Sequence, residues 1–321
     1  MKVSVIIPVY NTEKYIGRCL NSILRQTHRD FEVLCVNDCS PDHAMDVVGR
    51  YARRDPRIKM LGHDRNRGPM VARQTGIQNA SGDFYMFVDS DDTLPVDAME
   101  SLIAAARKDA SEAVVAGHNV VDKDGNKTKE DFPLLQDGVY TPLEIFHSLV
   151  ERKIRHNLAF CIFAKSLFNG DFYTLENQAN CEDMILFYEL VGASKRVSVI
   201  RKAVYNYYQN PGSTTHTAIS RNVLNQMIYV FNFQYGFLVK NGLPESEVLG
   251  FVLPDLNILY LYGGKDLLQK LNPKILEALD KHAIRNYLPL KKRISHLMCK
   301  SMPRLALLLL KAKALLRKQL V

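Results

Sequence analysis

Hydrophobic and polar positions follow two alternating patterns through the first 90 residues. Runs in which nearly every residue is apolar predict buried strands, and apolar residues three and four apart predict helices. The predicted strands are residues 2–9, 31–36, 58–61 and 84–88, and the predicted helices between them are 12–24, 42–54 and 69–79. We expect Asn11 or Thr12 to cap the first helix. The alternation predicts a mostly parallel sheet with helices on both faces.

The pattern is less regular beyond residue 95. The predicted helices are 96–108, 141–150 and a segment that opens at Glu182, and the predicted strands are 113–121 and 197–208. Residues 126–180 carry one other readable run, 161–168, which predicts a strand followed by a helix. From residue 219 to 316 the pattern is mainly helical, with breaks at glycine and proline positions.

The charge is concentrated at the C-terminal end. Residues 291–321 hold nine Lys or Arg and no acid, and the remainder, with 33 basic and 34 acidic residues, has a net charge of −1. The overall net charge of +8 therefore gives no sign of a nucleic-acid partner for the body. We expect three parts: a sheet domain over 1–215, a helical region over 216–290 and a basic amphipathic tail over 291–321.

The composition predicts an ordinary globular protein of the cytoplasm. Of the 321 residues 47% are hydrophobic and 24% charged, and the six cysteines show neither a CxxC pair nor zinc-like spacing, which favours reduced thiols. Met1 leads directly into a strand-like run, without the features of a secretory signal. The longest apolar run, Leu305–Leu310, is far shorter than the ~20 residues of a membrane-spanning helix.

The stretch GDFYMFVDSDD, residues 82–92, carries the strongest chemical signal. A buried strand ends in three carboxylates within four residues, those of Asp89, Asp91 and Asp92. Alternate residues of an extended chain point to the same side, so we expect Asp89 and Asp91 to face one bound group. Such oxygen ligands suit Mg²⁺ or Mn²⁺ together with substrate phosphates. A single Asp would satisfy a helix cap, a role that Asp92 or Thr93 could play.

Polar residues also follow the first and second predicted strands. In open parallel sheets, ligands bind at the carboxyl ends of the strands, where Asn11 and Asp38 fall. Pro8, Tyr10 and Asn11 lie where the first strand meets the first helix, whose free N–H groups favour phosphate. Asp38 could bind a base or ribose. The alternative is local: Pro8 ends the strand, Asn11 caps the helix and Asp38 caps the following turn.

The loop HDRNRG and the helix after it bring arginines toward the same edge. Asn66 and Gly68 lie in the loop, and Arg73 lies one turn into the helix. Guanidinium groups suit bidentate recognition of phosphate. A solvated basic loop is the alternative, and it is weaker for Arg73 than for the loop arginines.

Two later positions are candidates for chemistry. Glu182 and Asp183 open a helix, where acids also favour the helix dipole. A model Asp titrates at about 3.9, so Asp183 is expected to be ionised at neutral pH and able to act as a general base. His216 closes the loop GSTTH and could bind a metal or phosphate, although a lone loop histidine often has no special role.

Five segments, in order and at matching spacing, resemble the family 2 glycosyltransferases, inverting nucleotide-sugar enzymes with the GT-A fold. They are VSVIIPVYNTEKYIGRCLNSILRQT, FEVLCVNDCSPD, NRG with ARQTGI, GDFYMFVDSDD and CEDMILFYEL, and they cover about the first 210 residues. The resemblance implies a Rossmann-like, mostly parallel central sheet flanked by helices, followed by a C-terminal helical region.

The resemblance also implies roles for individual residues. The Pro-x-Tyr-Asn segment, Pro8, Tyr10 and Asn11, would line the nucleotide pocket, and Asp38 would read a uracil. The Asp-x-Asp motif falls on Asp89, Ser90 and Asp91, with Asp89 near the ribose and Asp91 on a Mn²⁺ or Mg²⁺ ion. Asp183 would be the catalytic base, beside Glu182 near the acceptor, and His216 would assist the metal or diphosphate. The loop residues Asn66, Gly68 and Arg73 complete the predicted nucleotide-sugar site, although Gln74 replaces the usual Asn after the arginine.

The expected activity is transfer of a single sugar from a UDP-sugar to a glycan or lipid-linked hydroxyl acceptor in bacterial surface-glycan synthesis. The chain contains no Trp, and so it lacks the Gln-x-x-Arg-Trp motif of processive synthases. Two alternative functions are a nucleotidyltransferase and a non-catalytic nucleotide-sugar-binding module. A nucleotidyltransferase would usually carry a glycine-rich phosphate loop after the first strand, where this chain has no such glycines. A binding module would not need the Glu-Asp pair.

The basic tail has two interpretations. Leucines alternate with Lys and Arg over residues 291–321, a pattern typical of helices that lie on anionic membranes. The tail would then dock a cytoplasmic enzyme peripherally on the inner face of the membrane. Alternatively, its leucines contact the body of the protein.

Overall fold

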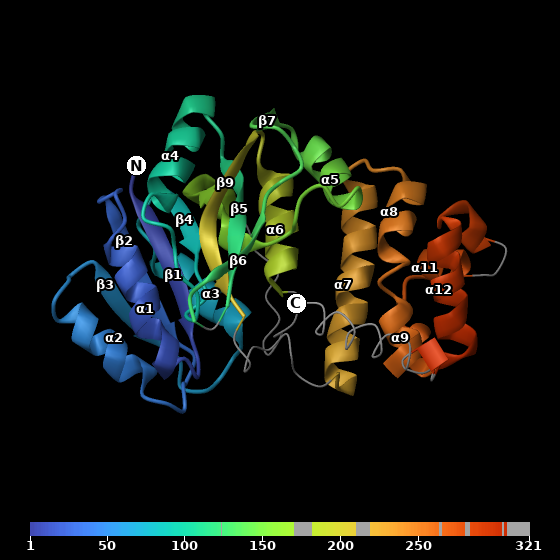
Figure 1. Cartoon of the computed structure of the whole chain (residues 1–321), viewed down its shortest axis with the longest axis horizontal. Helices are drawn as coiled ribbons and strands as arrows, with labels where there is room; N and C mark the ends of the chain where they lie inside the picture. Colours follow the sequence, from blue (N-terminus) through green and yellow to red (C-terminus); the bar gives the residue numbers. More distant parts are fainter. Residues whose placement is uncertain are drawn as a thin grey trace. The chain divides into compact units, whose positions relative to one another are not determined.

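The computed structural model describes residues 1–122, 124–169, 182–209, 219–262, 265–279, 283–303 and 305–306. They belong to two compact units, Met1–His216 and Thr217–Val321, drawn from blue to yellow and from orange-yellow to red in Figure 1. The separate tail over 291–321 stays a prediction, because residues 307–321 lie outside the described part of the chain.

One mixed sheet organises the first unit. Its described strands are β1 (Val3–Val9), β2 (Phe31–Asn37), β3 (Ile58–Gly62), β4 (Phe84–Phe87), β5 (Ala113–Val121), β6 (Lys127–Asp131), β7 (Gly138–Tyr140), β8 (Cys161–Ala164) and β9 (Val197–Tyr208). Their order is β3-β2-β1-β4-β8-β5-β9-β7, with β6 beside β5. The first four strands are parallel, as the sequence predicts. Strand β8 runs antiparallel to both β4 and β5, so the second half of the sheet is mixed.

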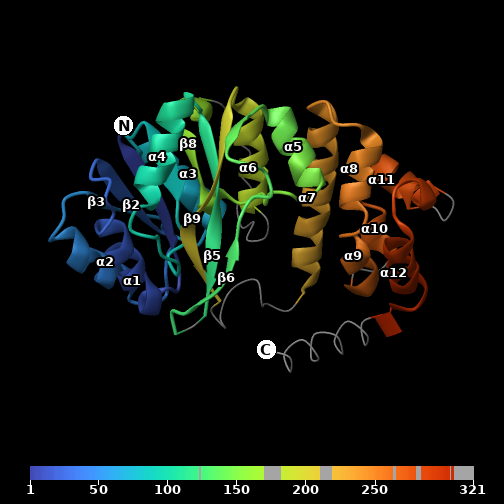
Figure 2. The same ribbon diagram turned by 45° about the horizontal axis from the view of Figure 1, so that its top comes forward.

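Helices cover both faces of the sheet (Figures 1 and 2). The described α-helices of this unit are α1 (Glu13–Leu24), α2 (Ala44–Ala52), α3 (Pro69–Asn79), α4 (Ala98–Asp109), α5 (Pro142–Val150) and α6 (Glu182–Ala193). Alternate residues of β1, such as Val5 and Ile7, share one core with α1, α2 and α4. Ile6 points to the other face, against α3. A Cβ added to Gly76 of α3 would lie 2.4 Å from Cγ2 of Ile6, so this helix lies unusually close to the sheet.

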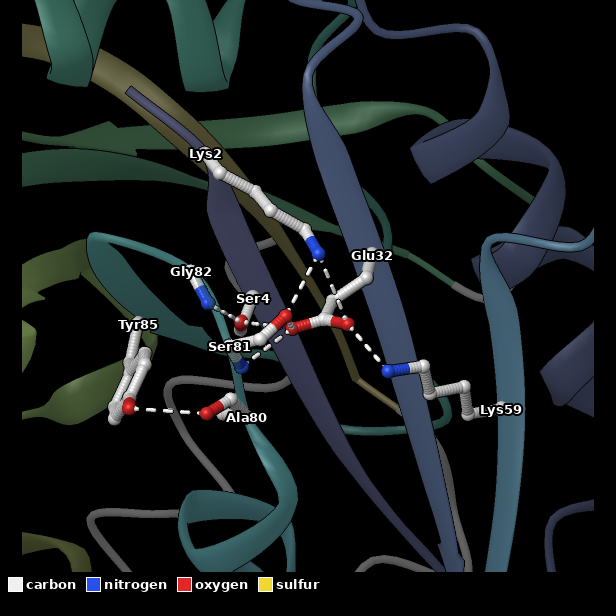
Figure 3. A network of polar contacts seen from close by, with 8 residues as sticks. All are labelled: Lys2, Ser4, Glu32, Lys59, Ala80, Ser81, Gly82 and Tyr85. Carbon is white, nitrogen blue, oxygen red and sulfur yellow. Dashed lines mark hydrogen bonds and ion pairs between the residues drawn. The ribbon is translucent and has the colours of Figure 1, made fainter.

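A buried carboxylate fixes the amino ends of the central strands (Figure 3). Glu32 of β2 is 2% exposed and accepts hydrogen bonds from Ser4 Oγ (2.7 Å), Ser81 N–H (2.7 Å) and Lys59 Nζ (2.8 Å). Burial alone would raise the pKa of Glu32, but the hydrogen bonds from Lys59, Ser4 and Ser81 hold that pKa well below its ordinary value. Gly82 N–H also donates to Ser4 Oγ at 2.8 Å. The network thus holds the turn before β4.

Two local expectations need correction. Thr12 occupies the N-cap position of α1, which begins at Glu13, but its side chain makes no capping hydrogen bond. Instead, the Glu13 N–H donates to the Asp42 carboxylate at 2.7 Å, and Asn11 adopts a left-handed conformation with φ 55°. Thr93 does not cap α4 either, because it pairs with Asn206 of β9 and the helix begins five residues later, at Ala98.

The second unit is helical in its described part. Its α-helices are α7 (Arg221–Lys240), α8 (Glu245–Val252), α9 (Asn257–Tyr262), α10 (Lys265–Leu268), α11 (Pro273–Ala278) and α12 (Leu290–Ser301). The helices are separated near the glycine and proline positions that the sequence marks as breaks. Among the described helices of both units, none combines the length and apolarity needed to cross a bilayer.

Candidate active site

Strand β4 delivers the acidic residues to the carboxyl edge of the parallel strands. The Val88 N–H donates to the Ile6 carbonyl at 3.1 Å, and the chain then turns. The Asp92 N–H donates to the Asp89 carbonyl at 3.0 Å, so residues 89–92 form a tight turn, called here the acidic turn. The expectation of extended backbone through Asp89 and Asp91 is therefore wrong, although both stay at the strand end.

The carboxylates of the acidic turn have different environments. Asp92 is 1% exposed and accepts hydrogen bonds from the Tyr205 hydroxyl and the Tyr208 N–H, both at 2.8 Å. Burial, followed by the charges of Asp91 and Asp89, raises the pKa of Asp92 well above its ordinary value. The Asp89 side chain is 47% exposed. Asp92 is thus an internal structural group and does not cap the next helix.

Arg73 joins the acidic turn to a second acidic pair. Its side chain is 6% exposed, with Nη1 2.7 Å from Glu182 Oε1 and Nη2 3.0 Å from Asp89 Oδ1. Because Arg73 comes from α3 and Glu182 opens α6, one guanidinium ties two helices and the end of β4 together. The motifs around residues 73, 89 and 182, distant in sequence, therefore meet in one place.

Asp183 lies within the electrostatic field of the same cluster. Burial, and then the negative charge of Glu182, raise the pKa of Asp183 to about 7, while Arg73 opposes the shift and Asp89 adds to it. The expectation that Asp183 is fully ionised at neutral pH is therefore wrong: the argument used an exposed reference Asp, and this one is desolvated beside other acids. A carboxyl group with a pKa near neutrality is well matched to general-base chemistry.

Asp38 holds the loop that leads into α3. It is 2% exposed and accepts hydrogen bonds from the backbone N–H groups of Arg67 and Gly68 and from His63 Nδ1, each at 2.8 Å. The other ring nitrogen of His63 lies 2.8 Å from Thr75 Oγ1. Sequence reasoning missed His63, whose only signal is its place directly after the third strand. Asp38 thus shapes the loop, and its role toward a nucleotide stays a prediction.

The remaining candidates lie around the same edge, with one exception. Tyr10 is 48% exposed at the end of β1, and the N–H of the exposed Asn11 donates to Ser40 Oγ at 2.8 Å. Pro8 lies within β1, Asn66 is exposed in the loop before α3, and Ser90 is buried in the acidic turn. His216 lies outside the described residues. Their roles toward a ligand stay predictions.

The acidic turn can contribute to a metal site. The described residues contain no group of three or more His, Cys, Asp or Glu arranged to hold a metal ion. Mg²⁺ sites that also bind substrate phosphates often use only one or two protein carboxylates. Asp91 and Asp89 offer hard oxygen donors of this kind, so the donor set fits such an ion.

Comparisons with known proteins identify the family of the chain. The family model described as glycosyl transferase family 2 matches residues 4–173. EpsH of Bacillus subtilis (strain 168), a provisionally named glycosyltransferase, is 31% identical over 281 residues, which cover 84% of this chain and 80% of EpsH. EpsJ of the same organism, named an uncharacterized glycosyltransferase, is 32% identical over 221 residues, 66% of this chain and 62% of EpsJ. The chain thus spans less than two thirds of EpsJ.

A solved structure has the same fold. Residues 1–349 of TarS from Staphylococcus aureus, in complex with UDP-GlcNAc, match with a TM-score of 0.68 at 22% identity, covering 94% of this chain and 88% of that one. TarS is named a poly(ribitol-phosphate) β-N-acetylglucosaminyltransferase. The structural match confirms the GT-A fold expected from the sequence. Together with the family model and EpsH, it shows that the chain belongs to glycosyl transferase family 2, the enzymes that transfer glycosyl groups.

Proposed function

We propose that the chain transfers one sugar from a UDP-sugar to a hydroxyl acceptor, with inversion and with the help of a divalent metal ion. The observation that carries the proposal is the double contact of Arg73, which brings Glu182 within 2.7 Å and Asp89 within 3.0 Å of one guanidinium. A donor site at the acidic turn and a base at the start of α6 then share one location. A nucleotide-binding module without catalysis would not require this pairing.

The chain's own residues supply the steps of the proposed reaction. Asp183 accepts the proton of the acceptor hydroxyl, and the oxygen attacks the anomeric carbon on the face opposite the diphosphate. A single displacement of this kind inverts the configuration. Asp91, with Asp89, would hold the metal ion, which supplies positive charge to the leaving diphosphate. Arg73 keeps Glu182 and the acidic turn together throughout.

The choice of UDP and of a surface glycan rests on the comparisons. The TarS structure contains UDP-GlcNAc, and its name describes transfer onto poly(ribitol-phosphate). By analogy, we propose a UDP-sugar donor and a glycan or lipid-linked acceptor of the capsule, lipopolysaccharide or teichoic-acid type.

Two substitutions test the proposal. UDP release is measured with a panel of UDP-sugars and Mn²⁺, and UDP affinity is measured by calorimetry. Asp183→Asn should bind UDP as the parent does but lose turnover by about 10²-fold or more, because a general base is typically worth 10²–10⁴-fold. Asp91→Ala should lose metal-dependent UDP binding. Parental turnover in Asp183→Asn would refute the assignment of the base, and release of sugar 1-phosphate instead of UDP would indicate a nucleotidyltransferase.

We further propose that α12 docks the enzyme on an anionic membrane. The helix buries His296 and Cys299 and leaves Leu290, Ile294 and Leu297 exposed by 63%, 51% and 39%. These three positions, four and three residues apart, form one stripe. The basic residues of the same helix are Lys291, Lys292, Arg293 and Lys300. An exposed apolar stripe on a helix that carries four cations suits an acidic lipid surface.

Vesicle co-sedimentation tests this docking. The full chain with Leu290→Gln, Ile294→Gln and Leu297→Gln should sediment less with phosphatidylserine vesicles than the parent. Leu134→Gln, which changes a side chain that is 70% exposed in the first unit, is the control and should bind like the parent. Equal sedimentation of all three proteins would exclude α12 as the docking surface.

A further inference from the structure

The acidic turn is fastened to a strand that is not its neighbour in the sheet. Strands β8 and β5 lie between β4 and β9. Even so, the Thr93 N–H donates to the Asn206 carbonyl at 3.3 Å, and the Asn206 N–H donates back to the Thr93 carbonyl at 2.8 Å. The chain after β4 therefore pairs with the end of β9 at an isolated bridge.

Tyrosines at the end of β9 extend this connection to the turn itself. The Tyr205 hydroxyl accepts a hydrogen bond from the Asp89 N–H at 3.1 Å and donates one to Asp92 Oδ2 at 2.8 Å. The Tyr208 N–H donates to Asp92 Oδ1 at 2.8 Å. Tyr205 is fully buried, so these bonds are shielded from water. Both oxygens of Asp92 are thereby committed to β9.

Arg18 of α1 closes the connection from the other side. Its guanidinium carbon lies 3.5 Å from the centre of the Tyr208 ring, and Nη2 donates to the Asp91 carbonyl at 2.6 Å. The Arg18 side chain thus contacts both the end of β9 and the acidic turn. A planar guanidinium can stack on a ring and donate a hydrogen bond at its edge at the same time, which an ammonium group does less well.

We propose that Arg18, Tyr205 and Tyr208 are positioning residues, together called the turn clamp, that hold the acidic turn in the shape that binds a metal-bound diphosphate. The clamp holds the Asp89 N–H, the Asp91 carbonyl and the Asp92 carboxylate. None of these contacts uses the carboxylates of Asp89 or Asp91. The inference rests on the proposed function, because it concerns the same site, and it assigns Asp92 a structural role.

The affinity for UDP measured by calorimetry with and without Mn²⁺ tests the clamp. Arg18→Met removes the cation while keeping an unbranched chain, and Tyr208→Leu removes the ring. Each should weaken UDP binding in the presence of Mn²⁺ by about 10- to 100-fold, the usual cost of removing a group that orients a metal ligand. Each should change the weaker UDP binding measured with EDTA much less, because the clamp acts on the turn that binds the metal ion. A general loss of folding would instead weaken UDP binding with Mn²⁺ and with EDTA alike.

Matched controls lie on the same strand. Tyr208→Phe keeps the ring, and Tyr207→Phe changes a neighbour that takes no part in the clamp contacts; both should bind UDP with Mn²⁺ as the parent does. Thermal unfolding without ligand shows whether each variant folds, and Tyr208→Leu carries the test if Arg18→Met does not fold. Parental binding by Arg18→Met and Tyr208→Leu would overturn the clamp alone. A parent that does not bind UDP with Mn²⁺ would overturn both the clamp and the proposed function.

Discussion

The raised pKa of Asp183 makes the pH dependence of the reaction a direct test of the site. The pKa of about 7 arises from burial and from the adjacent Glu182 charge, against an ordinary value of 3.8. The base must be ionised to accept a proton, so activity should rise with pH through neutrality. With a pKa of about 7, about a tenth of the enzyme carries an ionised base at pH 6 and about nine tenths at pH 8. The value of kcat/KM should therefore rise about tenfold over this range, whereas an ordinary Asp would give a flat profile.

Two substitutions should move this profile in opposite directions. Glu182→Gln removes a negative charge that raises the pKa of Asp183, so the midpoint should move to lower pH. Arg73→Met removes a positive charge that lowers the same pKa, so the midpoint should move to higher pH. A neighbouring charge typically shifts a pKa by about one unit or more, which corresponds to about 1.4 kcal/mol per unit.

The assay is kcat/KM for the UDP-sugar from pH 5.5 to 9, because this ratio reports on groups of the free enzyme. Ionisation of the substrate and of the metal ion affects the parent and the variants equally. A difference between their pH midpoints of kcat/KM therefore arises from a group of the protein. The midpoint does not depend on the absolute rate, which both substitutions could lower. A flat parental profile between pH 6 and 8 would refute the reasoning, as would shifts of both variants in the same direction.

Three further predictions concern stability, measured by denaturant unfolding. Gly76→Ala places a Cβ 2.4 Å from Ile6 and should destabilise by about 1–3 kcal/mol. In Gly236→Ala of α7, the added Cβ would have no described atom within 4 Å apart from its chain neighbours and its own helix backbone, so this variant should be neutral or stabilising by up to about 1 kcal/mol. Glu32→Gln should cost about 1–3 kcal/mol; the lowered pKa of Glu32 means that its contribution is present above pH 4.5 and is lost as the pH falls. The folded state holds the Asp183 proton more tightly than the unfolded state, so the free energy of unfolding falls as the pH rises from 3.8 to about 7. Asp183→Asn has no carboxyl group to ionise, so its free energy of unfolding should fall by about 2–4 kcal/mol less over this range.

Much of the fold could be predicted from local pattern. The first four strands were marked by apolar runs, and α3 begins at Pro69 and ends at Asn79 as predicted, because proline favours a first helical position. Strands β6 and β7 were missed. The sequence of β6, KTKED, is polar throughout and exposed except at the partly buried Asp131, and it is a strand only because β5 supplies hydrogen-bond partners. Nothing within those five residues carries that information.

The motifs of the site could be predicted from the sequence, but the residues whose contacts hold those motifs in place could not. The acidic residues and the Glu-Asp pair are recognisable from their own segments. The contacts that organise them join positions far apart in sequence: 73 residues separate Arg18 from Asp91, and 116 separate Tyr208 from Asp92. An arginine in an amphipathic helix and a tyrosine in a strand are ordinary residues in local pattern. Only the tertiary fold distinguishes them from their neighbours.

The charge balance around Arg73 changes the interpretation of the site. From sequence, Arg73 was a candidate ligand for the donor's phosphates. In the structure its guanidinium lies 2.7 Å from Glu182 and 3.0 Å from Asp89, and it also acts on Asp183, so one cation already serves three carboxyl groups. A diphosphate would add further negative charge to this cluster. Donor binding therefore needs a further positive charge beside the Asp91 carboxylate. This need is the physical reason for expecting a divalent metal ion at the acidic turn.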